Sequence, residues 1–485
     1  MKLSNLLSSI DLSLKTEDYQ VTDIVSNGNN IKQNCIFVCI KGEHFDSHTL
    51  ISEALNKGAC AIICSEKTEI DNEKIYQVCD TRRALAILYF TFENVKTENL
   101  EFFAVTGTNG KTTVTTIINH ILKSFNLKTG LIGTIENCIG DDHSKAFATT
   151  PEPIMLAKLI KKMEENNCKT IVLEASSQAL YQQRLASIKF KIAAFTNFSV
   201  DHLDYHKTME EYFSAKKMLF EKCDIAVLNG DDKNVMTISE QETLSYKTFS
   251  IKNLNCDFFA SEIGYYDNAV NFIINYRNFE KRKIEKAKVW FNMPGEYSVY
   301  NALCAVAVCV SYGLDFKKCA KSLYSFKGVK GRCQYIKTGK GFKVIIDFAH
   351  TPQGLEKMLW AVKKGAKGRI ILVFGCGGDR DKTKRPQMGL AAAKGADYIF
   401  LTSDNPRTED PYSIISDVEA ELKNHTVPYE VYVDRKIAIE NALRKAKKDD
   451  IVILAGKGHE DYQIIGTKIN NFDEEKIVKE ILKNM

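Results

Sequence analysis

Short apolar runs alternate with helix-like segments along the whole chain, and this alternation limits the possible folds more than any other feature. The runs are continuously apolar, which is typical of parallel strands that helices cover on both faces. We predict strands at Cys35–Ile40, Ala59–Cys64, Phe102–Thr106, Thr170–Glu174, Ile192–Thr196, Ile225–Leu228, Phe342–Asp347, Arg369–Phe374, Tyr398–Thr402 and Asp450–Ala455. The pattern predicts an α/β fold with doubly wound sheets, whose ligand sites lie at the carboxyl ends of the strands.

The segments between these strands predict helices and possible domain borders. Helices are expected at Thr81–Phe92, Val114–Phe125 and Asn301–Tyr312, and a polar, aromatic stretch at 246–290 predicts additional β structure. A chain of 485 residues is long enough for about three domains. With a candidate hinge at Gly328–Gly331, we expect domains at residues 1–100, 101–330 and 331–485.

Charge and cysteine content exclude several classes of protein. The 66 basic and 61 acidic residues are interspersed and leave a net charge of +5, so neither nucleic acid nor a membrane surface is an expected partner. The 14 cysteines form no C-x-x-C pair, which indicates free thiols in a reducing compartment. The chain shows no signal peptide pattern and no long apolar stretch, so we expect a cytoplasmic protein without a membrane span. Only 12 of the basic residues are arginine, which makes the place of each one informative.

A glycine-rich loop follows the strand Phe102–Thr106 and precedes a helix. Its residues are Gly107, Thr108, Asn109, Gly110, Lys111, Thr112 and Thr113. The strict pattern G-x-x-x-x-G-K-[ST] is not met, because its first glycine falls at Val105. The order of strand, glycine-rich turn, G-K-T and helix still predicts a phosphate site, in which Lys111 reaches the β- and γ-phosphates and Thr112 reaches Mg²⁺.

Carboxylates and histidines that could hold a metal follow the next strands. Glu174 ends the strand Thr170–Glu174, where a carboxylate can bind Mg²⁺, although a solvated strand end is the alternative for a lone residue. His202 and His206 are four residues apart, which fits one helix face and zinc chelation; the interleaved Asp201 and Asp204 also permit a hard cation. An isolated pair of this kind is more often surface or capping chemistry. From pattern alone Lys216 is an ordinary helix-surface lysine.

Ten motifs occur in an order that resembles the Mur ligase family over nearly the whole chain. They are GTNGKTT, TTPEP, LEASSQAL, FTNFSVDHLDYH, YFSAKKMLF, MPGEYSVYNALCA, DFAHTP, GCGGDRD, DNPRTEDP and GKGHE. The resemblance implies a UDP-sugar domain, a central P-loop ATPase domain and a Rossmann-like C-terminal domain that takes the amino acid. It also implies an ATP- and Mg²⁺-dependent ligase of peptidoglycan biosynthesis, expected to be a monomer. Within the family, the motifs are most similar to the branch that joins meso-diaminopimelate to UDP-N-acetylmuramoyl-L-alanyl-D-glutamate through an acyl phosphate.

The resemblance also implies roles for individual residues. Thr112, Glu174, His202 and Lys216 would serve Mg²⁺, with Lys216 carbamylated by CO₂. The loop Gly107–Thr113 with Asn301, Arg332 and Asp347 would bind the nucleotide. The UDP-sugar peptide would be bound by Ser26, Thr149, Thr150, Ser176, Gln182 and Arg184. Diaminopimelate would be recognised by Arg380, Asp404, Asn405, Pro406, Arg407, Gly456 and Glu460.

Arg407 carries the choice of amino acid in this scheme. Diaminopimelate has a second carboxylate that lysine lacks, and the planar guanidinium suits a carboxylate. Family members that add lysine lack the arginine of the D-N-P-R motif, which is complete here at Asp404–Arg407. A solvated turn arginine is the alternative for Arg407 alone.

Three positions depart from the family pattern and keep other functions open. They are Asn27 beside the predicted uracil site, Gln178 in LEASSQAL and Gln334 after Arg332, where the family usually has Arg, His and Glu. None falls in the phosphate loop or on Glu174, His202 or Lys216. The alternatives are the same reaction with lysine, a divergent ligase similar to folylpolyglutamate synthetase, and a nucleotide-binding switch that catalyses no ligation.

Overall fold

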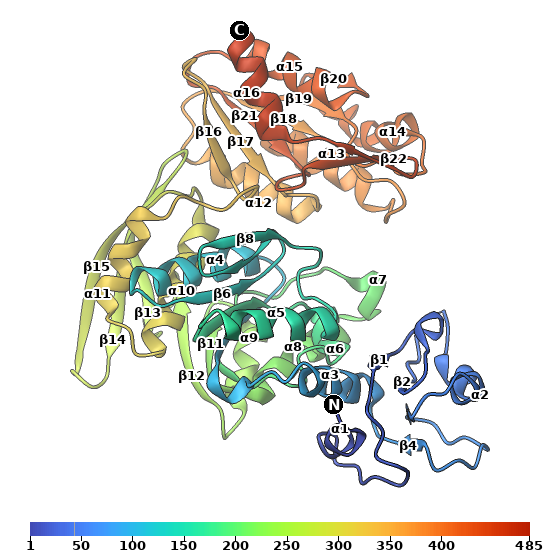
Figure 1. The fold of residues 1–485 in the computed structure, drawn as a ribbon. Helices are drawn as coiled ribbons and strands as arrows, with labels where there is room; N and C mark the ends of the chain where they lie inside the picture. Colours follow the sequence, from blue (N-terminus) through green and yellow to red (C-terminus); the bar gives the residue numbers. More distant parts are fainter. Residues whose placement is uncertain (43) are drawn as a thin grey trace. The chain divides into compact units, whose positions relative to one another are not determined.

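The computed structural model describes residues 1–42 and 44–485, and the side chain of Asp204 lies outside the described set. The chain forms two compact units, one of residues 1–248 and 307–313 and the other of residues 249–306 and 314–485. Each unit is an assembly of sheets and helices (Figure 1).

The first unit begins with a parallel four-stranded sheet in the order β1-β2-β3-β4. Its strands are β1 (Asp23–Val25), β2 (Cys35–Val38), β3 (Ala61–Cys64) and β4 (Ile75–Gln77). The helices here are α1 (Leu3–Ser8), α2 (Ile51–Asn56) and α3 (Thr81–Phe92). Asp80 caps α3 by accepting hydrogen bonds from two N–H groups of its first turn, which fixes where that helix starts.

A second sheet in this unit carries the phosphate loop. This part of an 11-stranded sheet has the strand order β12-β11-β10-β5-β9-β6-β7-β8, and β11, β10, β5, β9 and β6 are parallel neighbours. The strands are β5 (Glu101–Thr106), β6 (Thr129–Ile132), β7 (Glu136–Ile139), β8 (Asp142–Lys145), β9 (Thr170–Glu174), β10 (Phe190–Phe195), β11 (Cys223–Asn229) and β12 (Ser245–Ser250). The helices are α4 (Lys111–Ser124), α5 (Pro153–Glu165), α6 (Ser177–Tyr181), α7 (Leu203–His206), α8 (Met209–Lys217) and α9 (Lys233–Met236). Because these strands are parallel, the carboxyl ends of β5, β9, β10 and β6 meet at one edge.

The second unit starts with three antiparallel strands, β13 (Phe258–Tyr265), β14 (Val270–Asn278) and β15 (Lys283–Phe291). Helices α10 (Glu296–Ser311) and α11 (Phe316–Ser322) follow in the chain. A six-stranded sheet then has the order β16-β17-β21-β18-β19-β20, parallel except for β16. Its strands are β16 (Gln334–Lys337), β17 (Lys343–Asp347), β18 (Ile370–Phe374), β19 (Tyr398–Thr402), β20 (Tyr429–Tyr432) and β21 (Ile451–Ala455), and β22 (Tyr462–Ile465) and β23 (Lys468–Asn471) form a hairpin.

Helices cover both faces of the six-stranded sheet (Figure 1). The helices α12 (Pro352–Lys363), α13 (Lys384–Gly395) and α14 (Pro411–Leu422) pack on the side chains of one face, including Leu372 and Ile399. The helices α15 (Arg435–Lys445) and α16 (Glu474–Asn484) pack on the other face, including Ile371 and Val373. Neighbouring residues of one strand thus enter two different cores, which explains why the central strands β18 and β21 are apolar at every position.

The predicted α/β class is confirmed, and all ten predicted strands are present with ends shifted by two residues or fewer. The helix Thr81–Phe92 has its predicted bounds, and the stretch 246–290 forms β structure. Helix α4 begins three residues before the predicted start, because Gly110 closes the loop in a left-handed conformation. Within residues 1–42 and 44–485, no helix combines the length and the hydropathy that crossing a bilayer requires.

A buried ion pair holds two strand ends in the six-stranded sheet. The side chains of Arg435 and Glu474 are at most 1% exposed, and Arg435 Nε lies 2.8 Å from Glu474 Oε1. The same guanidinium donates to the carbonyl oxygens of Ala455, which ends β21, and Ser403, which follows β19. The pair therefore fixes the strand ends from which two predicted substrate motifs begin.

We expect R435M to destabilise the protein by about 3–5 kcal/mol, because it leaves the Glu474 carboxylate buried without its counter-charge. The double variant R435M/E474L should recover part of that loss, since neither charge then remains, although the carbonyl oxygens of Ala455 and Ser403 still lack the Arg435 donor. Chemical denaturation monitored by circular dichroism measures both. Equal destabilisation in the single and double variants would contradict the assignment of the loss to an unpaired charge.

Candidate active site

The phosphate loop lies at the carboxyl end of β5 and opens α4. Gly107 has φ 141° and Gly110 has φ 90°, conformations that side chains disfavour. A Cβ atom on Gly107 would also collide with the hydroxyl of Thr196. Across the loop, Asn109 N donates to Asn197 Oδ1 at 3.0 Å, and Thr108 exchanges hydrogen bonds with the backbone of Ser199. The loop is therefore shaped by β10 and the segment after it, and its place at the helix N-terminus suits an anion.

Lys111 folds over this loop. Its Nζ atom donates to Gly107 O at 2.8 Å and to Thr108 O at 3.0 Å. Thr112 and Thr113 follow on α4 and are buried. The charged amine is thus held at the face of the loop to which a phosphate chain would bind.

Glu174 receives hydrogen bonds from both sides of the sheet edge. The carboxylate accepts from Thr112 Oγ1 at 2.9 Å, from Thr134 Oγ1 at 3.0 Å and from Thr134 N at 2.7 Å, and the residue is 1% exposed. A buried carboxylate beside two hydroxyls is a set of hard oxygen donors, which is the chemistry that Mg²⁺ prefers. The structure excludes the alternative of a solvated strand end for Glu174.

Sequence reasoning missed Thr134. This residue lies two positions after the end of β6, and its hydroxyl also lies 3.0 Å from Thr149 Oγ1. A polar residue after a buried strand was the available signal, but β6 is a short run of TGLI that we did not predict as a strand.

The residues predicted for the sugar peptide gather beside Glu174. Thr150 Oγ1 donates to Glu174 O at 2.6 Å and accepts from Ser176 N at 3.1 Å. Arg184 donates to Thr150 O at 2.8 Å and to Gln182 Oε1 at 2.9 Å. The structure brings these four residues and Thr149 together, whereas Ser26 lies after β1 in the four-stranded sheet.

The predicted pairing of His202 and His206 on one helix face is wrong. His202 has φ 53° and precedes α7, whose four residues end at His206. The His206 ring is buried, with Nε2 2.9 Å from Ser177 Oγ, while His202 is 41% exposed and lies edge-on to Tyr212. The interleaved carboxylate of Asp204 lies outside the described residues. His202 by itself remains a candidate ligand.

Lys216 is buried instead of lying on the helix surface. It is 1% exposed on α8, and its Nζ atom donates to Gly107 O at 3.0 Å and lies 4.5 Å from the centre of the Tyr212 ring. Burial lowers the pKa of Lys216 well below its ordinary value, the charge of Lys111 lowers it further, and Asp201 opposes both. A neutral amine is nucleophilic, so this residue is chemically suited to covalent modification.

In the second unit, two of the residues predicted for the nucleotide meet at the carboxyl end of β17. Asp347 accepts hydrogen bonds from Cys333 N at 2.7 Å and Ala349 N at 2.8 Å. Burial raises the pKa of Asp347, and the charge of Arg332 opposes that shift. The Arg332 guanidinium lies 4.5 Å from the centre of the Phe348 ring. Asn301 is buried on α10.

The residues predicted for the amino acid lie after β18, β19 and β21. Arg407, in a left-handed conformation with φ 52°, donates from Nη1 to Gly378 O at 2.7 Å, in the loop that also carries the exposed Arg380. Asn405 Nδ2 donates to Glu460 Oε2 at 3.0 Å. Gly456 has φ 113°, and a Cβ atom there would lie 2.6 Å from Asp404 Oδ2. The structure therefore brings D-N-P-R, G-G-D-R-D and G-K-G-H-E to one edge of the sheet.

Lys457 joins these motifs, and sequence reasoning missed it. Its side chain is 0% exposed, and Nζ lies 3.1 Å from Asn405 Oδ1, 3.2 Å from Glu460 Oε2 and 3.5 Å from Asp404 Oδ1. These contacts orient the Asn405 amide and the Glu460 carboxylate. Lys457 belongs to the motif G-K-G-H-E, from which only Gly456 and Glu460 were predicted to bind the amino acid.

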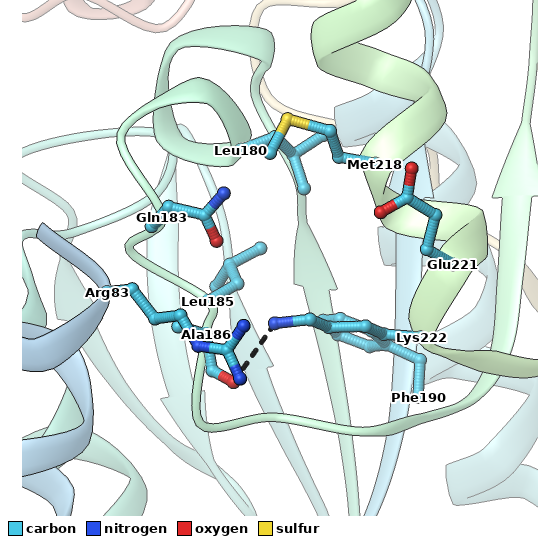
Figure 2. A pocket seen from close by; sticks show the side chains of 9 residues that line it. All are labelled: Arg83, Leu180, Gln183, Leu185, Ala186, Phe190, Met218, Glu221 and Lys222. Carbon is cyan, nitrogen blue, oxygen red and sulfur yellow. Dashed lines mark hydrogen bonds between the residues drawn. The ribbon is translucent and has the colours of Figure 1, made fainter. Parts of the chain in front are cut away.

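A separate cavity of about 100 Å³ lies near the amino end of β10, at the edge opposite to the phosphate loop (Figure 2). Its lining contains none of the predicted site residues, and its volume is too small for a nucleotide. Burial lowers the pKa of Lys222 in this cavity, and the charge of Arg83 lowers it further. The lining residues are Arg83, Leu180, Gln183, Leu185, Ala186, Phe190, Met218, Glu221 and Lys222.

Comparison with known proteins assigns the chain to a family. Residues 105–309 match the Mur ligase middle domain, and residues 331–458 match the Mur ligase glutamate ligase domain. The UDP-N-acetylmuramoyl-L-alanyl-D-glutamate–2,6-diaminopimelate ligase 2 of Clostridium acetobutylicum is 40% identical over 99% of this chain and 100% of that protein. A solved structure of an enzyme with that substrate name has a TM-score of 0.73 and 28% identity, and the match covers 100% of this chain and 99% of that one. The MurF ligase of Thermotoga maritima, solved in complex with ADP, shares the fold with a TM-score of 0.61 at 19% identity, and the match covers 96% of this chain and 98% of that one. The chain belongs to the Mur ligase family.

Proposed function

We propose that this protein is an ATP-dependent ligase that joins meso-diaminopimelate to UDP-N-acetylmuramoyl-L-alanyl-D-glutamate in peptidoglycan biosynthesis. The observation that carries the proposal is the cluster of Arg407, Asn405, Glu460 and Lys457 at the edge of the six-stranded sheet. It offers a guanidinium beside a buried amide and a partly exposed carboxylate. Those groups match a ligand head that carries both a carboxylate and an ammonium.

The reaction forms an amide bond through an acyl phosphate. The free carboxylate of the UDP-dipeptide attacks the γ-phosphorus of ATP and releases ADP. The amine of diaminopimelate then attacks the acyl carbon, and the tetrahedral intermediate expels phosphate. The backbone N–H groups of Gly107–Thr113 and the amine of Lys111 hold the phosphate chain during transfer, so the chain contributes mainly positioning and charge stabilisation.

Thr112 and Glu174 are the residues that would hold Mg²⁺ beside the phosphates. The ion would neutralise the charge of the phosphate oxygens. His202 and Lys216 would serve a second Mg²⁺. The neutral amine of Lys216 adds to CO₂ and loses a proton to form a carbamate, which converts a buried nitrogen into an oxygen ligand of the kind that Mg²⁺ prefers.

The sugar peptide would lie along Thr149, Thr150, Ser176, Gln182 and Arg184, with Ser26 nearer the uracil. Asn301, Arg332 and Asp347 would contact the nucleotide. In this scheme, residues 1–100, 101–330 and 331–485 act as domains for the UDP-sugar, ATP and the amino acid. The protein works as a cytoplasmic monomer.

Specificity for diaminopimelate comes from Arg407 and Arg380. A site that pairs arginine with the second carboxylate rejects lysine, because lysine would leave the guanidinium without that partner. The alternatives of a lysine-adding enzyme, a folylpolyglutamate-synthetase-like ligase and a switch without ligation each predict a different response to a panel of amino acids.

We expect ADP release by the full-length enzyme to require both the UDP-dipeptide and meso-diaminopimelate. The assay measures ADP with ATP, Mg²⁺, the UDP-dipeptide and, in turn, meso-diaminopimelate, L-lysine or L-glutamate. Turnover with lysine should be lower by about 10²-fold or more, the loss expected when a buried polar group stays unpaired. Equal turnover with lysine would contradict the specificity, and ADP release that needs no amino acid would contradict the ligase assignment.

A further inference from the structure

The hairpin of β7 and β8 carries three side chains of types that can bind a metal ion, and they lie on one face. Glu136 and Cys138 are two residues apart on β7 and so point to the same side of the strand. His143 on β8 stands directly opposite Cys138 in the antiparallel register. The backbone pairing alone therefore brings a carboxylate, a thiol and an imidazole together.

The ligand atoms of these residues converge on one point. His143 Nδ1 lies 3.3 Å from Cys138 Sγ and 2.9 Å from Glu136 Oε2, and all three atoms lie within 4.8 Å of one another. Ligands of a tetrahedral zinc ion, at bond lengths of about 2.0–2.3 Å, lie about 3.3–3.7 Å apart. A small contraction or expansion of this triangle would fit the ion.

His143 Nδ1 lies against both the thiol and the carboxylate. A neutral Nδ1 atom carries either one proton or one lone pair, so it can donate to Glu136 or accept from Cys138, and the thiol can also donate to Glu136. In a catalytic relay, the thiol and the carboxylate would contact different nitrogens of the imidazole ring. Here Cys138 and Glu136 both contact Nδ1 of His143. A shared cation satisfies all three atoms at once.

We propose that Glu136, Cys138 and His143 form a site for Zn²⁺, separate from the phosphate loop and its Mg²⁺ chemistry. A thiol, an imidazole and a carboxylate are the donor set that zinc prefers over magnesium. On binding, the Cys138 thiol loses its proton to solvent and forms the Zn–S bond, and the neutral His143 binds through Nδ1 with its proton on Nε2. Cys138 is 0% exposed, while the His143 and Glu136 side chains are 54% and 37% exposed, so solvent reaches the site and can supply a fourth ligand.

Zinc binding is measured on the full-length protein by isothermal titration with Zn²⁺ and by the metal retained after dialysis against a weak chelator. We expect one Zn²⁺ per chain in the wild type and at least a tenfold weaker affinity in both C138S and H143Q. H143Q changes a half-exposed side chain, so it tests the site even if C138S folds poorly. Substitution by Co²⁺ should give a thiolate charge-transfer absorption band that C138S abolishes.

Two matched controls separate this site from other ligands. C79S changes an exposed cysteine, and H48Q changes the second group of close ligands, Asp46, His48 and Glu66. Both variants should bind Zn²⁺ with the affinity of the wild type. The proposal fails if the wild type retains no Zn²⁺, if C138S and H143Q retain it, or if H48Q removes it. None of these outcomes depends on ADP release, so the ligase assignment is tested independently.

Discussion

The variant K216R should lose at least about 10³-fold in turnover, the size of loss seen when a preorganised group that stabilises transition-state charge is removed. The amine of Lys216 is buried beside Lys111, and both burial and that neighbouring charge lower its pKa, so the neutral form can accept CO₂. Arginine keeps a permanent charge and cannot form a carbamate. The measurement is ADP release under saturating substrates, with thermal unfolding to confirm that the variant folds.

Lys217 provides a matched control for Lys216. It is the next residue on α8 and is exposed, so K217A should keep the turnover of the wild type. In K216A, an added short carboxylic acid should restore part of the activity, because it supplies the missing oxygens. Full activity in K216R, or an NMR spectrum of the active enzyme that shows no ¹³C-carbamate under ¹³CO₂, would contradict the proposed modification.

The second large effect is expected for R407A, which should raise the KM for diaminopimelate by about 10²–10³-fold. This corresponds to the loss of about 3–4 kcal/mol when one partner of a buried charge pair is removed. The KM for ATP should change by less than about threefold, because the phosphate loop is unaltered. Steady-state kinetics with each substrate varied in turn measure both constants.

Lysine at this position should not restore binding. R407K keeps the charge but lacks the planar fork that pairs with a carboxylate and with Gly378 O, so its KM should stay within about tenfold of that of R407A. R444A is the control, since Arg444 is exposed and pairs with Glu440 on α15. Parallel increases in the KM for ATP and for diaminopimelate in R407A would indicate a general distortion instead of a lost contact.

Much of the fold follows from local sequence. Strands such as Thr170–Glu174 and Tyr398–Thr402 are apolar at every interior position because both faces of their sheets are covered, and that signal needs no tertiary information. The run TGLI of β6 is too short to predict a strand, so the role of Thr134 after it was not predicted either. The prediction that His202 and His206 share one helix face was wrong, because α7 includes only His206. A four-residue spacing places two side chains on one face only if the helix includes both residues.

Two of the three residues that depart from the family pattern make hydrogen bonds within the protein. Gln334 accepts a hydrogen bond from Gly331 N at 2.8 Å and donates to Glu475 at 2.7 Å, and Asn27 caps the turn at Gly28–Asn30. Both side chains therefore have local roles that do not require the usual residue. Nothing in the structure explains Gln178.

The scarce arginines show how far sequence alone can go. Motif order singled out Arg184, Arg332, Arg380 and Arg407, and the structure places Arg184 beside Gln182, Arg332 over the Phe348 ring and Arg407 against Gly378 O. Arg385 and Arg435 looked ordinary, yet both are buried and hold carboxylates inside the second unit. A guanidinium can serve a ligand or a buried acid equally well, and only the surrounding chain decides which.

The sequence by itself determined the α/β class, the phosphate loop and the family, because each depends on residue types in a fixed local order. The tertiary structure decided which of those residues meet and what their surroundings do to them. Lys216 is an example. Helical spacing cannot reveal that the side chain of this residue on α8 is buried, with its amine against the phosphate loop. Burial lowers the pKa of Lys216, and burial is a property of the folded chain that no single segment encodes.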